Sequence, residues 1–307
     1  MPELPDVEGF RKVFASCAQG EVIRRVDVRD SGVLHGVSAR RLRAALEGRR
    51  FGRPERLGKW LLAPTGDART EDARTEDART EDARTEDART GDAPSDGVPT
   101  DAGPTDEGVA GPTVLLHFGM TGRLVCGRPD DELDPHDRVL FAVGDDRQLR
   151  YRDQRKLRGL WLAADDAAVA RLLDRQGPDA LTVDREEFEA ALSAHRGRVK
   201  AVLTDQSVLA GLGNLLADEI LWRARLNPAC HANDLSERER HRLYTHMRRT
   251  LRSAVTAGRV PPRPSWLTGH RDDPTPTCPR CHSPLRHARL SSRTTLWCPH
   301  CQPEGAA

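Results

Sequence analysis

Cys278-Pro-Arg-Cys281 and Cys298-Pro-His-Cys301 lie near the end of the 307-residue chain and form the stretch that most constrains its fold. Each is a Cys-x2-Cys knuckle, and sixteen residues separate the two. Four thiolates in two knuckles supply the closed tetrahedral ligand set of structural zinc and leave no open position for catalysis. The spacing therefore predicts one structural Zn²⁺ held by Cys278, Cys281, Cys298 and Cys301, with no catalytic cofactor. We expect His282, His287 and His300 to be loop residues rather than ligands.

The other three cysteines, Cys17, Cys126 and Cys230, are scattered along the chain. This distribution indicates a metal site in a reducing compartment rather than a disulfide framework. The sequence has no apolar run long enough to span a bilayer, and its first residues are acidic where a signal peptide would be basic. We therefore expect a cytoplasmic protein.

Upstream of the cysteines, apolar residues recur at three- and four-residue spacing, which predicts amphipathic helices. Ser236 and Glu239 have the spacing of a capping box, and three prolines end the region after residue 260. The predicted helices are Arg185–His195, Arg198–Leu203, Leu215–Ala224 and Ser236–Ala257.

Before residue 170 the pattern favours an N-terminal helix, about Asp6 to Cys17, on a β-rich domain. The predicted strands begin at Lys59, Thr113, Val139, Leu149 and Gly159. The sequence therefore predicts an α+β multidomain chain. Its parts are an N-terminal helix plus β-sandwich domain (1–170), a helical helix–two-turn–helix domain (171–265), a zinc-finger β-hairpin (270–303) and a short tail (304–307).

Residues 64–112 interrupt the β-rich domain with a repeated Asp-Ala-Arg-Thr-Glu pentapeptide and a Gly/Pro/Asp-rich tract. The segment is nearly devoid of apolar side chains, which predicts a disordered insertion in a hairpin turn. It contains five arginines and fourteen acidic residues, a net charge of −9, whereas the whole chain carries +1. The remainder therefore carries +10, which is consistent with a polyanionic partner such as DNA.

The start of the chain, Met1-Pro2-Glu3, carries a second chemical signal. Removal of Met1 leaves Pro2 as a free secondary amine, which can attack a sugar anomeric carbon and form an iminium ion. Glu3 is then placed to act as a general acid. A Met-Pro start alone is common and carries little weight.

A third signal, Gly211-Leu-Gly-Asn214, lies between two predicted helices. Glycines permit a tight turn there, and amides at the following helix N-terminus can hold a phosphate. Asn214 would cap that helix or contact the phosphate. An ordinary helix–helix turn explains the same residues, and a dinucleotide site is disfavoured because no strand precedes them.

Taken together, these motifs resemble formamidopyrimidine-DNA glycosylases and their endonuclease VIII relatives. The shared motifs, in family order, are Pro2-Glu-Leu-Pro-Asp-Val-Glu8, Leu57-Gly-Lys-Trp60, His117-Phe-Gly-Met-Thr-Gly122, Asp153-Gln-Arg-Lys156, Gly211-Leu-Gly-Asn214 and the four-cysteine finger. The resemblance covers nearly the whole chain except residues 64–112. It implies a bifunctional glycosylase and abasic-site lyase that removes oxidised or ring-opened bases from duplex DNA by β,δ-elimination, as a monomer.

The resemblance also implies roles for individual residues. Pro2 is the expected Schiff-base nucleophile, Glu3 the acid that opens the sugar, Lys59 a phosphate-binding group that assists β-elimination, and Arg293 a phosphate-binding group that supports δ-elimination. A flipped-out base leaves a hole in the duplex that side chains must fill. The residues expected to fill that hole or to contact DNA elsewhere are Met120, Arg155, Leu157, His136, Lys200 and Asn214. The alternatives are a solvated strand lysine for Lys59, a surface charge on the zinc hairpin for Arg293 and core packing for Met120.

Two departures bear on which lesion is chosen. Relatives usually carry Phe at the position of Leu157, followed by Gly where this chain has Arg158. The segment from Gly258 to Cys278 is shorter than in relatives that enclose 8-oxoguanine. The sequence therefore predicts poor 8-oxoguanine excision and leaves formamidopyrimidines, oxidised pyrimidines and abasic sites open. The alternatives are a lesion- or abasic-site-binding protein with weak catalysis and an unrelated zinc-ribbon nucleic-acid-binding protein.

Overall fold

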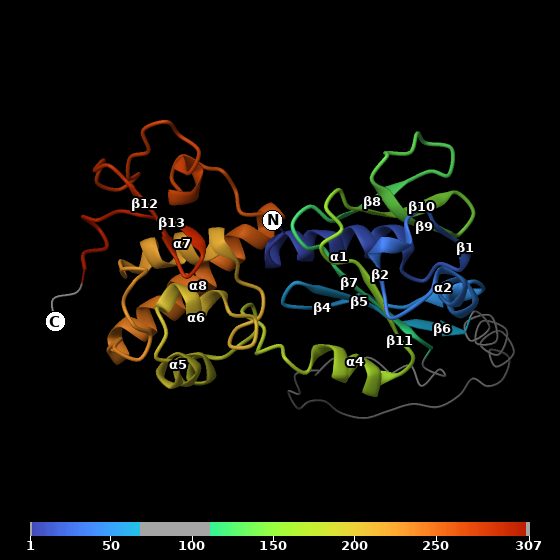
Figure 1. Ribbon diagram of the computed structural model, residues 1–307, viewed down its shortest axis with the longest axis horizontal. Helices are drawn as coiled ribbons and strands as arrows, with labels where there is room; N and C mark the ends of the chain where they lie inside the picture. Colours follow the sequence, from blue (N-terminus) through green and yellow to red (C-terminus); the bar gives the residue numbers. More distant parts are fainter. Residues whose placement is uncertain (1, 68–110, 305–307) are drawn as a thin grey trace, which may run out of the picture.

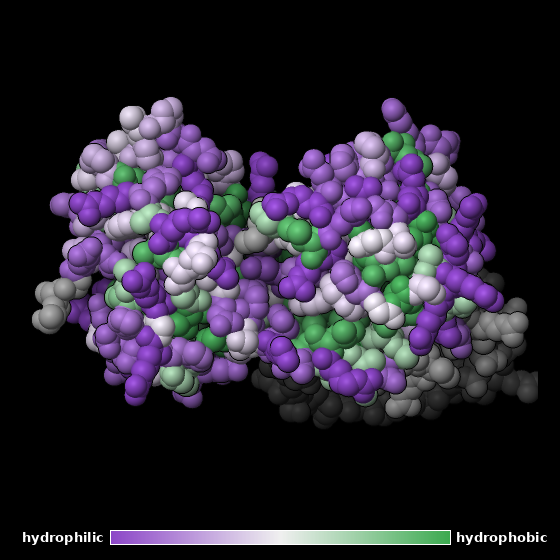
Figure 2. Space-filling view, in the orientation of Figure 1, coloured by the Kyte–Doolittle hydropathy of each residue, from purple (hydrophilic) through white to green (hydrophobic). Residues whose placement is uncertain are grey.

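The computed structural model describes residues 2–67 and 111–304, which form a β-rich lobe and a helical lobe (Figure 1). The N-terminus lies where the two lobes meet, at the start of helix α1 (Leu4–Ala18) (Figure 1). The space-filling view shows a notch between the lobes and mainly hydrophilic side chains on the face in view (Figure 2). Among the described residues, no helix is both long and apolar enough to cross a membrane.

Two sheets build the β-rich lobe. One has the order β1-β9-β10-β8 and the other the order β2-β11-β7-β5-β4. Neighbouring strands are antiparallel except β2 and β11, which are parallel. The strands are β1 (Ile23–Val28), β2 (Leu34–His35), β4 (Glu55–Leu57), β5 (Trp60–Ala63), β7 (Thr113–His117), β8 (Arg123–Gly127), β9 (Asp137–Val143), β10 (Arg147–Arg152) and β11 (Leu160–Ala163).

The two sheets share one apolar core. Val26 and Phe141 from the first sheet pack in one cluster with Leu61 and Leu116 from the second, and Phe14 of α1 joins them. Burial of such side chains is the main term that stabilises a sandwich of this kind. Helix α1 packs against strands of both sheets, so it is part of this core over most of its length.

The helical lobe confirms the helices expected from apolar spacing. They are α5 (Arg185–Ala194), α6 (Val199–Thr204), α7 (Asn214–Ala224) and α8 (Glu237–Ala257). Helix α4 (Asp166–Leu173), which was not predicted, precedes them and packs against β7 and β11 of the β-rich lobe. Ser236 caps α8, with Glu239 completing the capping box as its spacing predicts. Leu4, from the start of α1, lies in the apolar core of this lobe and so joins the two lobes.

A C-terminal hairpin, β12 (Arg286–Leu290) and β13 (Arg293–Trp297), packs on α7. Leu290 pairs with Arg293 across a two-residue turn in which Ser291 and Ser292 both have positive φ. Both central residues of a type I′ hairpin turn adopt this conformation.

Several short elements escaped prediction: the second helix α2 (Ala39–Leu46), the strand pair β3 (Arg49–Phe51) with β6 (Thr65–Asp67), and the short helices η1 (Ser31–Val33) and η2 (Leu267–His270). Strand β6 occupies the first residues of the predicted insertion, and β5 pairs with β7 across it as a hairpin would. Most of the insertion lies outside the described residues.

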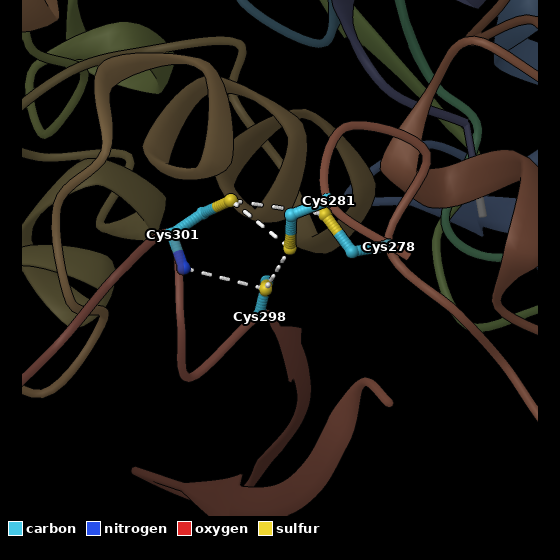
Figure 3. A group of neighbouring side chains, drawn as sticks. All are labelled: Cys278, Cys281, Cys298 and Cys301. Atoms are coloured by element: carbon cyan, nitrogen blue, oxygen red, sulfur yellow. Dashed lines mark hydrogen bonds between the residues drawn. The ribbon is translucent and has the colours of Figure 1, made fainter. Parts of the chain in front are cut away.

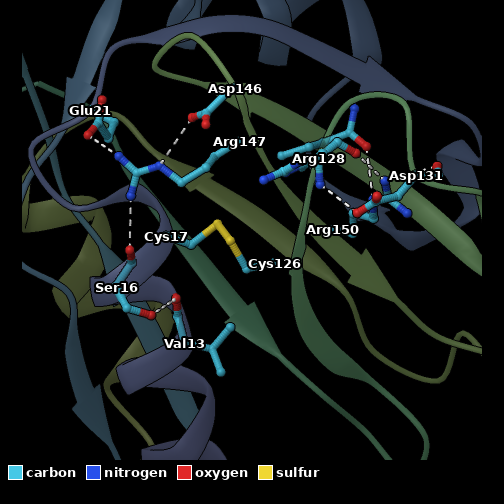
Figure 4. Close-up of a disulfide and its surroundings, with 11 residues drawn as sticks. Val13, Ser16, Cys17, Glu21, Cys126, Arg128, Asp131, Asp146, Arg147 and Arg150 are labelled. Atoms are coloured by element: carbon cyan, nitrogen blue, oxygen red, sulfur yellow. Dashed lines mark hydrogen bonds and ion pairs between the residues drawn. A yellow bond between two sulfur atoms is a disulfide. The ribbon is translucent and has the colours of Figure 1, made fainter.

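A disulfide joins Cys17 of α1 to Cys126 of β8 (Figure 4), with a Cα–Cα distance of 5.9 Å. The sequence analysis treated both as isolated cysteines, and that interpretation is wrong for this pair. The error has a simple cause: they are 109 residues apart, and only the packing of α1 against β8 brings them together. Cys230 is a free cysteine.

Candidate active site at the junction of the lobes

Glu3 is the most deeply buried acid at the junction, with 1% of its surface exposed. Its carboxylate accepts hydrogen bonds from the backbone N–H groups of Gly213, Leu215 and Leu216, at 3.0, 2.8 and 3.1 Å. These are the free amides at the N-terminus of α7, where the helix dipole favours a negative charge. Burial raises the pKa of Glu3, opposed by the charge of Lys59 and the amides of Leu215 and Leu216.

This arrangement corrects the expected use of the Gly211–Asn214 turn. The amides that would hold a phosphate instead hold Glu3, and Asn214 does not cap the helix, because Gly213 is the N-cap. A Cβ on Gly213 would lie 2.3 Å from the Glu3 carboxyl carbon, so only glycine allows this approach. Gly211 adopts φ +114 and accepts a 3.1 Å hydrogen bond from Leu4 N.

Lys59 lies beside Glu3 in the two-residue turn between β4 and β5 rather than on the strand itself, since Leu57 pairs with Trp60. Its Nζ donates a 2.8 Å hydrogen bond to Leu212 O, and 8% of the residue is exposed. Burial lowers the pKa of Lys59 to about 8, with Arg293 lowering it further and Glu3 opposing the change. A lysine with this pKa is divided between the ammonium and amine forms near pH 8, and the ammonium form predominates below that pH.

His117 is a member of this site that the sequence analysis did not name, although it begins a quoted motif. Burial, followed by the charges of Arg158 and Lys59, lowers its pKa to about 4, so the ring is neutral. Nδ1 accepts a 3.1 Å hydrogen bond from Gly119 N, which leaves the proton on Nε2. His117 can therefore donate to an acceptor near Lys59.

Pro2 precedes Glu3 and is partly exposed. Glu3 N donates a 2.8 Å hydrogen bond to the Asp6 carboxylate, which forms a capping box at the start of α1. Burial raises the pKa of Asp6. The chain entering α1 is thus held on both sides, by Asp6 from within the helix and by Gly211 from the other lobe, so Pro2 is presented at the junction.

Arg293 lies at the exposed tip of the C-terminal hairpin, and its charge acts on both Lys59 and Lys200. Two predicted DNA contacts hold the next residue of the hairpin. Asn214 Nδ2 donates to Thr294 O at 2.9 Å, and Lys200 Nζ donates to Thr294 O at 3.2 Å. The hairpin tip is therefore linked to Lys59 and Lys200 by charge and to Lys200 and Asn214 by hydrogen bonds. We call Glu3, Lys59 and the α7 amides that hold Glu3 the Glu3 pocket.

Met120, Arg155 and Leu157 form a separate group on the β-rich lobe. Met120 is 41% exposed and Leu157 50% exposed, so neither is a core residue. Arg155 Nη1 lies 3.1 Å from Met120 Sδ, and a Cβ on Gly119 would lie 3.5 Å from the Leu157 Cβ. We name the two loops that carry these residues, 117–122 and 153–158, the reading loops.

Buried Asp153 ties the reading loops together. Its carboxylate accepts hydrogen bonds from Thr121 Oγ1 at 2.5 Å and from Arg155 N at 3.1 Å, one from each loop. His136 lies beyond this contact, where it lines a cavity of about 250 Å³ with Thr121, Arg123, Arg152 and Gln154. Two of its three basic residues pair with acids, His136 with Asp134 and Arg152 with both Asp134 and Asp137.

Cys278, Cys281, Cys298 and Cys301 converge as their spacing predicts (Figure 3), with all four Sγ atoms within 4.8 Å of one another. A tetrahedron with bonds of about 2.3 Å has edges of about 3.8 Å, as zinc–thiolate sites require. Sγ–Sγ distances of 3.5 and 3.9 Å within the cluster agree with this geometry. Trp222 Nε1 and Arg280 N donate to Cys278 Sγ at 3.3 and 3.4 Å, as donors to a metal-bound thiolate do. The cluster fits a metal ion.

A β-sandwich, a helix–two-turn–helix lobe and a metal-binding hairpin that meet around a buried acid at the chain's start define a class of base-excision repair DNA glycosylases. The N-terminal domain model of formamidopyrimidine-DNA glycosylases matches residues 1–160, and their helix–two-turn–helix domain model matches residues 176–261. The chain belongs to the formamidopyrimidine-DNA glycosylase family, whose function includes abasic-site lyase activity.

Individual relatives support this membership over the full length. The formamidopyrimidine-DNA glycosylase of Heliobacterium modesticaldum is 31% identical over 98% of this chain and 100% of its own. That of Salinispora arenicola is 31% identical over 99% of this chain and 96% of its own.

Solved structures support the fold. A structure of MutM with DNA containing carbocyclic 8-oxo-G superposes with a TM-score of 0.78 at 23% identity, covering 99% of this chain and 100% of that one. The Lactococcus lactis enzyme with abasic-site DNA gives a TM-score of 0.77 at 23% identity with the same coverage.

Proposed function

We propose that this chain excises oxidised or ring-opened bases from duplex DNA through a Schiff base at Pro2 and then cuts the strand by β,δ-elimination. The observation that carries the proposal is the Glu3 carboxyl group, buried against the N-terminus of α7 beside Lys59 and one residue from Pro2. A carboxyl group with a raised pKa can keep its proton until the sugar accepts it.

The chemistry balances with the groups present. Once Met1 is removed, the Pro2 nitrogen lone pair forms a bond to C1′, and the base leaves with the glycosidic electron pair and a proton. Glu3 gives its proton to O4′ as the C1′–O4′ bond breaks, which leaves an iminium ion. A C2′ proton then passes to water, the C2′–H electron pair forms C2′=C3′, and the 3′ phosphate leaves with the C3′–O pair.

Other residues would hold the DNA. Lys59, Asn214 and Arg293 would bind the phosphates that flank the lesion, and His117 would add a neutral donor. Lys200 is 2% exposed and pairs with Asp218, so it would support this surface from beneath by holding the Thr294 carbonyl of the hairpin. Met120, Arg155 and Leu157 are exposed as a hole-filling group must be. His136 would contact a phosphate further along the duplex. We also infer that the protein acts as a monomer at the nucleoid in the cytoplasm.

We further propose that the four cysteines hold a structural Zn²⁺ ion. Bound zinc would supply cross-linking of the two knuckles and no step of the reaction, since four thiolates fill its coordination. Metal analysis of the purified protein is expected to give about one zinc per chain. Cys298→Ser should lose the zinc and the order of the hairpin, whereas Cys230→Ser, at the free cysteine, should retain both.

Borohydride trapping on duplex DNA with one abasic site tests the chemical proposal. Wild type is expected to form a covalent adduct that vanishes when one residue is added before Pro2. The matched control is Lys12→Gln on the same helix, which should retain the adduct. Tight binding without any adduct in wild type would overturn the proposal in favour of a lesion-binding protein.

A panel of duplexes tests lesion choice. From Leu157 and the short 258–278 segment, we expect faster excision of formamidopyrimidines than of 8-oxoguanine. Equal rates on both lesions would contradict this expectation.

A further inference from the structure

Asp218 of α7 is a buried acid that the proposed chemistry does not use. It is 1% exposed, and its two oxygens face different partners. Oδ1 lies 2.6 Å from Lys200 Nζ, and Oδ2 lies 2.9 Å from Arg271 Nη1. Oδ2 also accepts a hydrogen bond from Leu296 N of the hairpin, at 3.2 Å. Asp218 therefore connects α6, α7, the segment after η2 and strand β13.

The same partners converge a second time on the hairpin, at Thr294 O. This carbonyl accepts hydrogen bonds from Asn214 Nδ2 at 2.9 Å, Arg271 Nη2 at 3.1 Å and Lys200 Nζ at 3.2 Å. Lys200 Nζ also donates to Thr295 Oγ1 at 2.8 Å. Three donors on the carbonyl next to Arg293 fix where the hairpin tip lies against α7.

The positive charges of Lys200 and Arg271 explain why a carboxylate is needed at Asp218. Lys200 and Arg271 are two cations that would repel each other, and Arg293 adds a third nearby. Asp218 is the acid that lies between the first two, and without it both would lose an ion pair in a site that excludes water. Burial raises the pKa of Asp218, and the charges and hydrogen bonds of Lys200 and Arg271 oppose that shift and favour the carboxylate.

We propose that Asp218 is a positioning residue that sets the place of Arg293, through Lys200, Arg271 and the Thr294 carbonyl, for the second elimination step. This inference rests on the proposed lyase function. In that step the C4′ proton leaves, its electron pair forms C4′=C5′, and the C5′–O bond breaks so that the 5′ phosphate departs with the bonding pair. A guanidinium placed on this phosphate stabilises the departing charge.

Product partition on abasic-site DNA tests this assignment. With the damaged strand labelled at its 5′ end, β-elimination leaves an unsaturated aldehyde and β,δ-elimination leaves a 3′ phosphate, which separate on a denaturing gel. Asp218→Asn is expected to lower the ratio of δ to β product about tenfold, which is less than the loss of about 10² or more on removing such a donor, because Arg293 is displaced and not removed. The rate of borohydride adduct formation should stay within about twofold of wild type, because Pro2 and Glu3 are untouched.

Two further variants separate positioning from general damage. Arg271→Gln, at a less buried residue, should shift the partition in the same direction. Glu219→Gln is the matched control, since Glu219 is a buried acid on the same helix that pairs with Arg223 and contacts Thr268 instead of the hairpin. Its partition should equal that of wild type. Zinc content and thermal midpoint are measured for all three, so that a folding defect is seen directly.

A double-mutant cycle between Asp218 and Arg293 tests whether Asp218 acts through Arg293. If Asp218 acts through Arg293, then Asp218→Asn adds nothing to the δ loss of Arg293→Ala. Additive losses, a normal partition in zinc-bound Asp218→Asn, or equal loss of adduct and δ product would each overturn the inference. A wild type that forms the adduct but stops after β-elimination would also overturn it. A wild type without any adduct would instead overturn the proposed function itself.

Discussion

The Glu3 pocket and the reading loops lie on one molecule but are built in opposite ways. Glu3 is 1% exposed and is held by three backbone amides of the other lobe, so its position is set by the fold. Met120 and Leu157 are 41% and 50% exposed and are held mainly through the loop-to-loop contacts of Asp153. The acid of the proposed chemistry thus has support from both lobes, whereas the groups proposed to enter the duplex are exposed.

Substitutions in the Glu3 pocket should slow base excision more than substitutions elsewhere in the protein. Gly213→Ala places a methyl group 2.3 Å from the Glu3 carboxyl carbon, so the acid must leave the amides of α7. We expect base excision to slow by about 10² to 10⁴, the range lost with a general acid. Single-turnover excision of a formamidopyrimidine measures this effect.

The Glu3→Ala variant provides a control for Gly213→Ala. In a Glu3→Ala background the methyl group of Gly213→Ala meets no carboxyl group, so it should cost little further stability. Thermal midpoints of the two single variants and the double variant should therefore show strong coupling. Independent, additive midpoint shifts would mean that Gly213 is needed for the backbone of the turn and not for Glu3.

Lys59 should make DNA binding by the Glu3 pocket depend on pH, which binding by the reading loops should not. A bound phosphate favours the ammonium form, and the pKa of free Lys59 is lowered to about 8. Below pH 8 the lysine is already charged, and above it each complex must take up a proton. The Kd for abasic-site DNA should therefore be flat below pH 8 and rise by up to about tenfold per unit above it.

Lys59→Arg should abolish that rise, because arginine stays charged over this range. Leu157→Ala, in the reading loops, should weaken binding equally at all pH values. A wild-type profile that is flat to pH 10, or one that persists in Lys59→Arg, would remove Lys59 as the phosphate-binding group.

The helices of the second lobe, the cysteine cluster and part of the Glu3 pocket could be predicted from the sequence. Helical spacing and the Ser236 capping box predicted the helices of the second lobe, and the cysteine spacing predicted the metal cluster, because these patterns depend on neighbours in sequence. Ordered motifs placed Glu3, Lys59 and Arg293 in one site, and the structure brings them together.

The partners in that site were beyond sequence. The amides that hold Glu3 come from more than 200 residues away, and the same turn had been assigned to phosphate. His117 and Asp218 gain their roles only from burial beside Lys59 and Lys200. The disulfide between Cys17 and Cys126 depends on the packing of α1 on β8, which no spacing rule encodes. Short strands such as β3 carry too few residues to show a period.

An aromatic substitution in the reading loops should raise base excision, unlike the truncation Leu157→Ala. Leu157 is exposed and can enter the duplex only by shape, whereas an aromatic ring there would stack on a base. Stacking contributes at least about 1 kcal/mol, so Leu157→Phe should raise excision of a paired lesion about fivefold. Cleavage of an abasic site, where no base is flipped, should change by less than about twofold. A similar gain on both substrates would place the effect in general DNA affinity.

The smallest effect on activity is expected at the disulfide, although its effect on stability should be large. Helix α1 begins at the Glu3 pocket and is tied near its other end, by Cys17, to β8, the strand that follows the first reading loop (Figure 4). The bond closes a loop of 109 residues, so replacing both Cys17 and Cys126 by Ala should lower the free energy of unfolding by about 2–4 kcal/mol. The acid at the start of the helix keeps its own supports from α7, so lyase activity well below the melting midpoint should stay within about twofold.

Denaturant unfolding and lyase assays on the double variant measure the two effects side by side, with Cys230→Ser as the control that leaves both unchanged. Treating wild type with a thiol reductant should reproduce the double variant. A loss of lyase activity in parallel with stability would show that α1 transmits strain from β8 to Glu3, and the two regions would then be coupled through the helix rather than independently supported.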